Sequence, residues 1–457
     1  MAGPGCVATS LLAAQKTDWS NMARVVVAKF GGSSLADADH FRSVKEIVEA
    51  DASRTLVVPS APGKRDSDDH KVTDLLLMCQ QLAEHNIDPH EVFQMVSERY
   101  TSIRDELGLS FDIESELAQI KEDLSEGATV DYVASRGEYL NGLLLADYLG
   151  FPFVDAADVV VFDNSGDYDQ KRTLKAMRAR LGGNPNAVIP GFYGADETGQ
   201  IHTFSRGGSD VTGAIVARAA RADLYENWTD VSGFLQVDPR IVPEARPIEV
   251  VTYRELRELS YMGASVLHEE AIFPVREKGI PIQIRNTERS EDAGTLIVAD
   301  DARRQFVSVT GLAGMKDFSV ITLEKTLMNE ETGFLRKLIS VFETNNVSIM
   351  HVPSGIDSVS VVVRSEAVRF NLNKILAELR IYCDPDSISV SPGMALLAVV
   401  GRGMVQSPGV SAKIFTALAD AGVNIRMISQ GASELSIIVG VEDSRFEDAV
   451  RALSAAI

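Results

Sequence analysis

Hydrophobic and polar positions follow two different periods along the first two thirds of the chain. Short apolar runs rich in β-branched residues predict buried strands, and segments with apolar residues every three or four positions predict amphipathic helices between them. This alternation is typical of a mostly parallel sheet covered by helices on both faces. The expected strands are Arg24–Ala28, Thr55–Val58, Ala187–Pro190, Asp223–Asn227 and Ile282–Ile284, and the clearest helices are Ala38–Ala50 and Val211–Ala220.

Three stretches depart from the alternation. Residues 88–127 are polar and rich in helix formers, which predicts a helical insertion. Residues 291–305 are polar and predict a linker. The first 22 residues lack the basic start of a signal peptide and predict a disordered extension before a natural start at Met22. We therefore expect an extension (1–22), a catalytic domain (23–304) and a C-terminal region (305–457).

The last third of the chain contains an internal repeat. Gly333–Phe342 (GFLRKLISVF) aligns without a gap onto Gly409–Leu418 (GVSAKIFTAL), 76 residues later. Each unit reads as a turn, a helix, a Val-x-Ile strand, a glycine turn and a strand. A shared period with matching hydrophobic positions indicates a duplication. The same offset also pairs Val347/Val423, Ile349/Ile425, Gly355/Gly431, Ser360/Ser436 and Val363/Val439.

Composition narrows the class of protein. The 457 residues are 45% hydrophobic, which suits a globular protein of two or three domains. A net charge of -21 argues against a nucleic-acid or membrane surface, because phosphates would be repelled. No apolar run approaches the roughly 20 residues that cross a bilayer. Three scattered cysteines indicate a reducing compartment, so we expect a cytoplasmic protein with no nucleic-acid or membrane partner.

Val25–Ser34 (VVVAKFGGSS) reads as a strand that runs into a double glycine. Glycine lets the backbone approach phosphate oxygens, and a following helix offers its positive N-terminal end. Lys29, at the edge of the strand, can reach a phosphoryl group. The spacing matches neither the P-loop nor the Rossmann fingerprint. On its own the segment fits a plain strand-to-helix turn equally well.

KFGGSS resembles the opening of the amino-acid kinase superfamily, whose members phosphorylate carboxylates, carbamate or nucleoside monophosphates. Four further segments, in family order, resemble aspartate kinases in particular. The resemblance implies an α/β amino-acid kinase fold followed by two ferredoxin-like βαββαβ ACT domains. It also implies a monofunctional enzyme that phosphorylates L-aspartate with ATP. The four segments are Ser135–Glu138, Phe204–Asp210, Asn227–Val231 and Val237–Arg240.

The implied chemistry depends on positioning and positive charge. A carboxylate is already nucleophilic at neutral pH, so the reaction needs no general base. The resemblance assigns Lys29 to the phosphoryl oxygens, with the backbone of Gly31, Gly32 and Ser33 around them. Asp210 is expected to orient Lys29, although it also suits an N-cap for the helix that follows.

The substrate aspartate carries an ammonium group and two carboxylates. Arg206 can grip a carboxylate through two parallel hydrogen bonds, and Glu138 supplies the negative charge that an ammonium group needs. Without the resemblance, these two residues would fit a surface ion pair equally well. The other expected substrate contacts are Ser60, Gly208 and Ser209.

The resemblance assigns Thr229, Asp230 and Arg240 to the nucleotide. Leu235 stands where many relatives have Tyr, and Ser265 where many have Lys, so the adenine and phosphate contacts stay open. A sub-branch of aspartate kinases shares this variation. No histidines have metal-ligand spacing, so the expected metal is Mg²⁺ carried by ATP and held by phosphates and water.

The repeat resembles paired ACT domains, the first (316–390) inserted into the second (305–315 and 391–457). Many lysine-sensitive relatives have Asp where this chain has Met350, and Glu330 or Glu331 could replace that charge. Lysine is then the first effector to test and threonine the second. Alternatively the acids complement a helix dipole, and the ACT units serve only as dimer contacts. The expected effector residues are Met328, Glu330, Glu331, Gly333, Phe334, Leu335, Ile349, Met350 and Ser354.

Two other functions stay open. The chain could be a different amino-acid kinase, acting on glutamate, acetylglutamate or UMP, although the paired C-terminal units and Arg136–Glu138 count against it. It could instead be an inactive, ligand-sensing protein, which Leu235 and Ser265 favour and the intact Lys29 opposes. We expect a homodimer or a dimer of dimers that assembles through the ACT domains.

Overall fold

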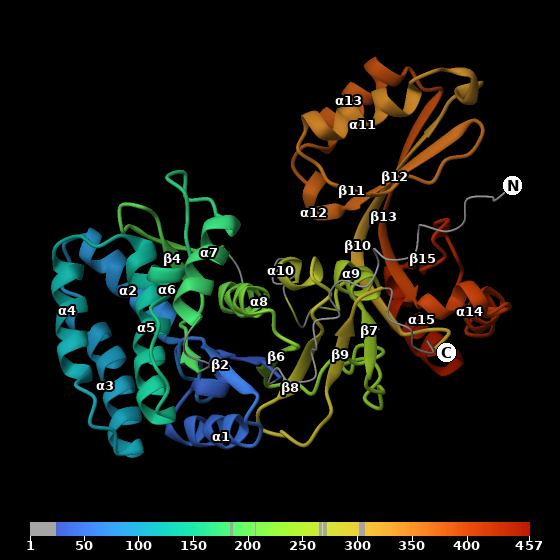
Figure 1. Ribbon diagram of the computed structural model, residues 1–457. Coiled ribbons are helices and arrows are strands. Elements are labelled where there is room, and N and C mark those ends of the chain that lie inside the picture. Colours follow the sequence, from blue (N-terminus) through green and yellow to red (C-terminus); the bar gives the residue numbers. More distant parts are fainter. Residues whose placement is uncertain (1–23, 183–185, 206, 265–266, 268–271, 301–306) are drawn as a thin grey trace, which may run out of the picture.

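The computed structural model describes residues 24–182, 186–205, 207–264, 267, 272–300 and 307–457. These residues form two regions (Figure 1), one around a seven-stranded sheet and one around a six-stranded sheet. We name them the catalytic region and the regulatory region after the roles that the family resemblance implies. The predicted N-terminal extension and the predicted boundary between residues 304 and 305 lie outside the described residues.

The seven-stranded sheet has the order β3-β2-β1-β6-β8-β9-β7. Neighbouring strands are parallel to each other except for the pair β8 and β9, which is antiparallel. All residues of β1 are buried, as expected for a strand covered on both faces. The strands are β1 (Val26–Phe30), β2 (Arg54–Pro59), β3 (Ala187–Val188), β6 (Leu224–Thr229), β7 (Val250–Thr252), β8 (Ile282–Asn286) and β9 (Thr295–Val298). A separate hairpin pairs β4 (Tyr193–Ala195) with β5 (Ile201–Thr203).

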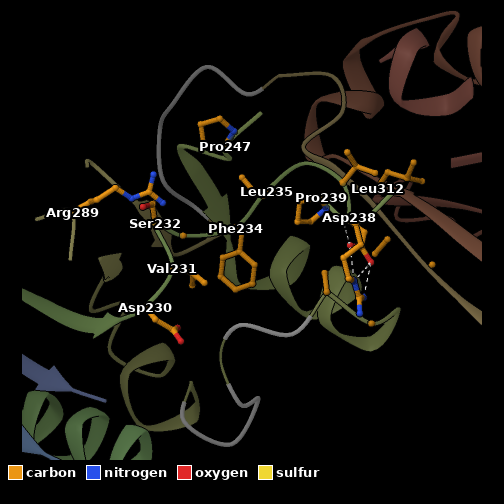
Figure 2. A pocket seen from close by; sticks show the side chains of 17 residues that line it. Asp230, Val231, Ser232, Phe234, Leu235, Asp238, Pro239, Pro247, Arg289 and Leu312 are labelled. Atoms are coloured by element: carbon orange, nitrogen blue, oxygen red, sulfur yellow. Dashed lines mark hydrogen bonds and ion pairs between the residues drawn. The ribbon is translucent and has the colours of Figure 1, made fainter. Parts of the chain in front are cut away.

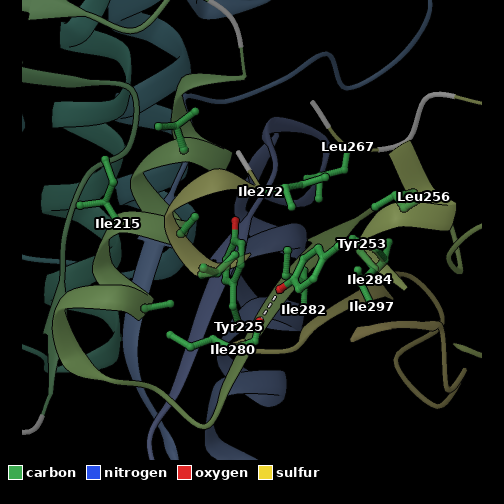
Figure 3. Close-up of a cluster of buried hydrophobic side chains, with 14 of the residues drawn as sticks. Ile215, Tyr225, Tyr253, Leu256, Leu267, Ile272, Ile280, Ile282, Ile284 and Ile297 are labelled. Carbon is green, nitrogen blue, oxygen red and sulfur yellow. Dashed lines mark hydrogen bonds between the residues drawn. The ribbon is translucent and has the colours of Figure 1, made fainter. Parts of the chain in front are cut away.

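Helices cover both faces of this sheet, which confirms the predicted fold class. On one face, Phe30 and Val57 pack against η2 (Gly32–Leu35), α1 (Ala38–Glu49), α2 (Val72–Glu84), α3 (His90–Leu107), α4 (Ile113–Ser125) and α5 (Val130–Leu149). On the other face, Val27 and Val58 pack against α6 (Ala156–Val159), α7 (Gln170–Leu181), α8 (Gly208–Ala220), α9 (Tyr253–Tyr261) and α10 (Phe273–Arg276). Figure 3 shows part of this second core, where Tyr225 and Ile282 lie close to Tyr253 of α9.

The predicted linker is wrong in part. Residues 291–305 contain β9, which pairs with both β8 and β7 inside the catalytic sheet. Thr295–Val298 is a short run of apolar and β-branched residues, and its polar neighbours hide it from a composition average. Gly294, at φ 68°, permits the tight approach to β8 that this pairing requires.

The six-stranded sheet has the order β11-β12-β10-β13-β15-β14 and is antiparallel throughout. Two long strands, β10 (Gly311–Glu324) and β13 (Ser387–Val400), pair along their whole length and serve both regulatory units. The predicted boundaries at 315/316 and 390/391 therefore fall inside strands. The shorter strands are β11 (Ile349–His351), β12 (Ser358–Arg364), β14 (Met427–Gln430) and β15 (Ser436–Glu442).

Each half of the regulatory sheet has its own helices and hydrophobic core. The first unit contains η4 (Met328–Glu330), α11 (Phe334–Thr344), α12 (Ser365–Val368) and α13 (Leu372–Cys383). The second contains η5 (Arg402–Gln406), α14 (Val410–Asp420), η6 (Asp443–Arg445) and α15 (Phe446–Ala456).

The internal repeat is present, but its register changes within each unit. Helices α11 and α14 begin at residues 334 and 410, 76 residues apart as the sequence indicates. Strands β12 and β15 begin at 358 and 436, 78 residues apart. The pairings of Ser360 with Ser436 and of Val363 with Val439 are therefore wrong by two residues. A strand shifted by two positions keeps its side chains on the same faces, so the hydrophobic pattern conceals the slip.

Helix α9 joins the two regions, as Figure 1 shows. Glu255, Glu258 and Tyr261 lie three residues apart and so share one face of the helix, which points toward the regulatory region. Glu255 accepts hydrogen bonds from the Thr310 hydroxyl (2.7 Å) and the Arg402 backbone N–H (2.8 Å). Glu258 accepts one from the Ser436 hydroxyl (3.0 Å), and the Tyr261 hydroxyl donates to Met350 Sδ (3.1 Å).

Candidate active site

The candidate site lies where β1, β2 and β6 end, the edge at which open parallel sheets usually bind ligands. Lys29 lies near the end of β1 and pairs in the ladder with Asn227 of β6. Ser60 follows β2, and Asp210 lies in the first turn of α8. Sheet topology thus brings together residues that are far apart in sequence.

The ammonium group of Lys29 is held by a carboxylate. Lys29 Nζ lies 2.6 Å from Asp210 Oδ1, and Asn227 Nδ2 donates to the same oxygen at 2.9 Å. The Tyr225 hydroxyl donates to the Asp210 backbone carbonyl at 3.1 Å. Lys29 is only 7% exposed. A buried ammonium fixed in this way is preorganised to meet negative charge that develops beside it.

The double glycine lies beside Lys29. A Cβ on Gly31 would come 3.6 Å from Lys29 Nζ, and the Gly31 backbone N–H donates to the Trp228 carbonyl at 2.9 Å. A Cβ on Gly32 would lie 2.8 Å from the Ala61 carbonyl oxygen, so a side chain at this position would displace the loop after β2. The segment therefore needs glycine where the two loops cross.

Glu138 brings an unusual carboxyl group to the site. Its side chain lies on α5 and is only 6% exposed, and its Oε2 atom has no hydrogen-bond partner among the described residues. Burial raises the pKa of Glu138 to about 8, against the opposing influence of the Ala61 backbone N–H and the Lys29 charge. The group can thus change its charge near neutral pH when a cation arrives.

The structure describes three of the other expected substrate contacts, Ser60, Gly208 and Ser209. Ser60 is half-buried, and Ser209 is buried in the first turn of α8 next to Gly208. A Cβ on Gly191 would lie 2.6 Å from the Ser209 side chain, so this loop packs closely on the helix start. Arg206 lies outside the described residues.

Part of the expected nucleotide set lines a cavity of about 590 Å³. In Figure 2, Asp230 lies on one side of Phe234 and Asp238 on the other. Asp238 forms an ion pair with Arg240 at 2.6 Å. Leu235 also lines the cavity. Leu312, Ala313 and Gly314 of β10 also line it, so a strand of the regulatory region contributes to its wall. Thr229 is not among the lining residues, and Ser265 lies outside the described part of the chain.

Residues 24–286 match the model of the amino acid kinase family, and residues 397–457 match an ACT domain. Aspartokinase 3 of Bacillus subtilis is 37% identical over 450 residues, which cover 93% of this chain and 97% of that protein. The chain belongs to the aspartokinase family.

Solved structures of aspartokinases have the same fold. Clostridium acetobutylicum aspartate kinase superimposes with a TM-score of 0.88 at 50% identity, covering 95% of this chain and 100% of that one. Escherichia coli aspartokinase III in complex with aspartate and ADP gives a TM-score of 0.72 at 26% identity, covering 95% and 100%. The resemblance to aspartate kinases is confirmed, and the chain is accordingly a kinase that phosphorylates aspartate.

The segments expected to hold an effector lie together in the first regulatory unit. Helix α11 begins at Phe334 after Gly333, and the short helix η4 precedes it at Met328. Glu331 is already paired, with Lys325 at 2.7 Å and with Lys337 at 2.6 Å. Glu330 is exposed, whereas Met328 and Phe334 are buried in the core of the unit, and Leu335, Ile349, Met350 and Ser354 are at least partly exposed.

Sequence reasoning missed two buried amides of this aspartokinase. Asn227 supports Asp210, and its position two residues before Thr229 on one strand was the signal available. Asn141 lies one helical turn after Glu138, and Asn141 Nδ2 donates to the Ser60 carbonyl at 2.7 Å. By contrast, the Arg136 guanidinium stacks on the rings of Tyr132 and Tyr139, so its role is in packing.

No group of three or more His, Cys, Asp or Glu side chains among the described residues is arranged to hold a metal ion. None of the described helices is both long and apolar enough to span a lipid bilayer.

Proposed function

We propose that the chain transfers the γ-phosphoryl group of ATP to the side-chain carboxylate of L-aspartate, giving 4-phospho-L-aspartate. This is the first step toward lysine, threonine and methionine. The observation that carries the proposal is the pair formed by Lys29 and Asp210 beside the glycine loop, with the buried Glu138 within electrostatic reach of Lys29.

The roles follow from the charges that meet. Lys29 stabilises the negative charge on the phosphoryl oxygens as they pass from ATP to aspartate, and Asp210 with Asn227 holds Lys29 in place. Glu138 binds the substrate ammonium, and Arg206 binds a carboxylate by the role that the family resemblance gives it. No group needs to remove a proton, because the attacking carboxylate is already ionised.

ATP and Mg²⁺ fit the described residues. Gly31, Gly32 and Ser33 offer a backbone cradle for phosphates, and the cavity lined by Asp230 and Arg240 is large enough for the nucleoside. Mg²⁺ usually keeps several waters and binds through one or two carboxylates plus phosphates, so a multidentate protein cage is not required.

We further propose that lysine, or else threonine, inhibits the enzyme through the first ACT unit. The structure of Escherichia coli aspartokinase III with lysine and aspartate supports this choice, at 26% identity and a TM-score of 0.71. Among the described strands, β11 pairs with β12 alone at the edge of its sheet, where a second chain could pair with it, which supports a homodimer or a dimer of dimers. A cytoplasmic location accords with the buried, unpaired Cys79 and Cys383.

An aspartate hydroxamate assay with ATP and Mg²⁺, with and without lysine and threonine, tests the proposal. Glutamate, acetylglutamate and UMP should give no product under the same conditions. ADP formation with one of these acceptors and not with aspartate would assign the chain to another branch of the superfamily, and amino-acid binding without turnover would identify an inactive sensor.

A further inference from the structure

Helix α5 places two buried acceptor groups on one face. Glu138 and Asn141 lie three residues apart, which puts their side chains next to each other on the helix surface. Glu138 is 6% exposed and Asn141 is fully buried. Both hold the loop after β2: the Ala61 backbone N–H bonds to Glu138, and Asn141 Nδ2 donates to the Ser60 carbonyl. The two side chains therefore face the same stretch of the candidate substrate site.

Each of these side chains keeps one oxygen without a partner among the described residues. The two atoms are Glu138 Oε2 and Asn141 Oδ1. The amide orientation of Asn141 is set by chemistry, because only its NH₂ end can donate to a carbonyl. Buried acceptors that lack a donor destabilise a protein, and functional sites are where such groups are retained. A ligand with several N–H donors would satisfy both atoms.

We propose that Asn141 is a substrate-binding residue whose Oδ1 atom accepts a hydrogen bond from the α-ammonium group of aspartate, next to Glu138. This inference rests on the proposed function. An ammonium group has three donors, so one can meet the carboxylate and another the amide. The neutral amide orients the ammonium group through a hydrogen bond. A second carboxylate at this position would instead repel both Glu138 and the substrate carboxylates. Asn141 then makes the site prefer an amino acid to a plain dicarboxylate.

The test compares two ligands that differ only in the amino group. The affinities of L-aspartate and of succinate are measured by calorimetry on the full-length wild type and on Asn141→Ala. We expect aspartate affinity to fall by about tenfold or more, since a hydrogen bond to a charged group is lost. Succinate affinity should stay within about twofold, because it has no ammonium group to lose. The KM for ATP should be unchanged.

Tyr100→Phe is the matched control. The Tyr100 hydroxyl, on helix α3, donates to the Gly137 carbonyl at 2.7 Å and so anchors the same turn of α5. This variant should leave the aspartate-to-succinate ratio as in the wild type. If Asn141→Ala fails to fold, Asn141→Ser keeps a small hydroxyl at the position, and it should also lower the ratio.

The outcomes separate this inference from the proposed function. A wild type that forms hydroxamate, together with a folded Asn141 variant whose ratio is unchanged or whose two affinities fall equally, overturns the role of Asn141 alone. A wild type that neither binds nor phosphorylates aspartate contradicts the proposed function, and with it this inference.

Discussion

Glu138 in the catalytic region and Glu331 in the regulatory region are both candidates to meet a ligand ammonium group, and the fold holds them in opposite ways. Glu138 is buried, and one of its oxygens has no described partner. Glu331 lies near the surface between Lys325 and Lys337. Burial raises the pKa of Glu138, whereas the two lysines lower the pKa of Glu331.

The difference teaches how much each acid gains from a ligand. A cation that reaches Glu138 supplies a missing partner to a desolvated group. A cation that reaches Glu331 has to replace a partner already present, in a solvent-exposed place where ion pairs contribute little. The Glu138 carboxyl group is therefore available to a ligand cation. In the regulatory region, Glu330 is more available than Glu331, because it is exposed and has no ion pair among the described side chains.

The largest effect should come from replacing Lys29, whose charge reaches Glu138. Lys29→Ala should lower kcat by about a hundredfold or more, since a preorganised cation is lost from the transition state. Lys45→Ala, on helix α1, where the Lys45 ammonium group donates to the Tyr148 carbonyl at 2.9 Å, serves as the control and should leave kcat unchanged. A well-folded Lys29→Ala enzyme with near-normal kcat would remove Lys29 from the mechanism.

Replacing the buried acid should act on substrate binding. Glu138→Gln keeps the shape and removes the charge, so the KM for aspartate should rise by about tenfold to a hundredfold while the KM for ATP changes little. Glu116→Gln, on helix α4, is the control for a charge lost away from the site. An equal rise in both KM values would show that Glu138 organises the whole site.

The raised pKa of Glu138 predicts a pH dependence with a definite sign. The free enzyme holds a proton on Glu138 below a pKa of about 8, and this proton must leave before an ammonium group can bind. The KM for aspartate should therefore fall as pH rises from about 6 to 8, and Glu138→Gln should flatten the profile. Without ligand, the contribution of this group to stability declines over the range from its unfolded pKa of about 4.5 to about 8. A wild-type KM that is constant across this range contradicts the assignment.

The smallest effect distinguishes the two acids of the regulatory unit. We expect lysine to inhibit, and either Glu330→Ala or Glu331→Ala to blunt the inhibition without lowering uninhibited activity. Glu330→Ala should have the larger effect, because Glu331 already has two partners; for Glu331→Ala we expect less than about a threefold shift in the inhibiting concentration. Calorimetry that detects no lysine binding to the wild type, alone or with threonine, would remove lysine as the effector.

The sequence predicted the alternation of strands and helices because the spacing of apolar residues within one element depends only on that element's own conformation. It placed Lys29, Asp210 and Glu138 at one site only through the resemblance, since their proximity depends on sheet order. Two errors have different causes. Polar neighbours hide the short apolar run of β9 from a composition average, and the two-residue slip between β12 and β15 leaves the same side chains on each face, so the hydrophobic pattern does not reveal it. The partners of Glu331 were likewise invisible, because Lys325 reaches it from the end of β10.

The sharing of β10 and β13 bears on how the regulatory region folds. Glu324 and Ser387 meet at one end of the ladder, and the whole first unit lies between them in sequence, so that unit acts as the turn of one very large hairpin. The entropy of closing such a loop grows only slowly with its length, and a folded first unit sets the register of both strands. The ladder can then extend toward Gly311 and Val400, where it meets α9. Neither unit can lose its strands without the other, so we expect the regulatory region to unfold in a single cooperative transition.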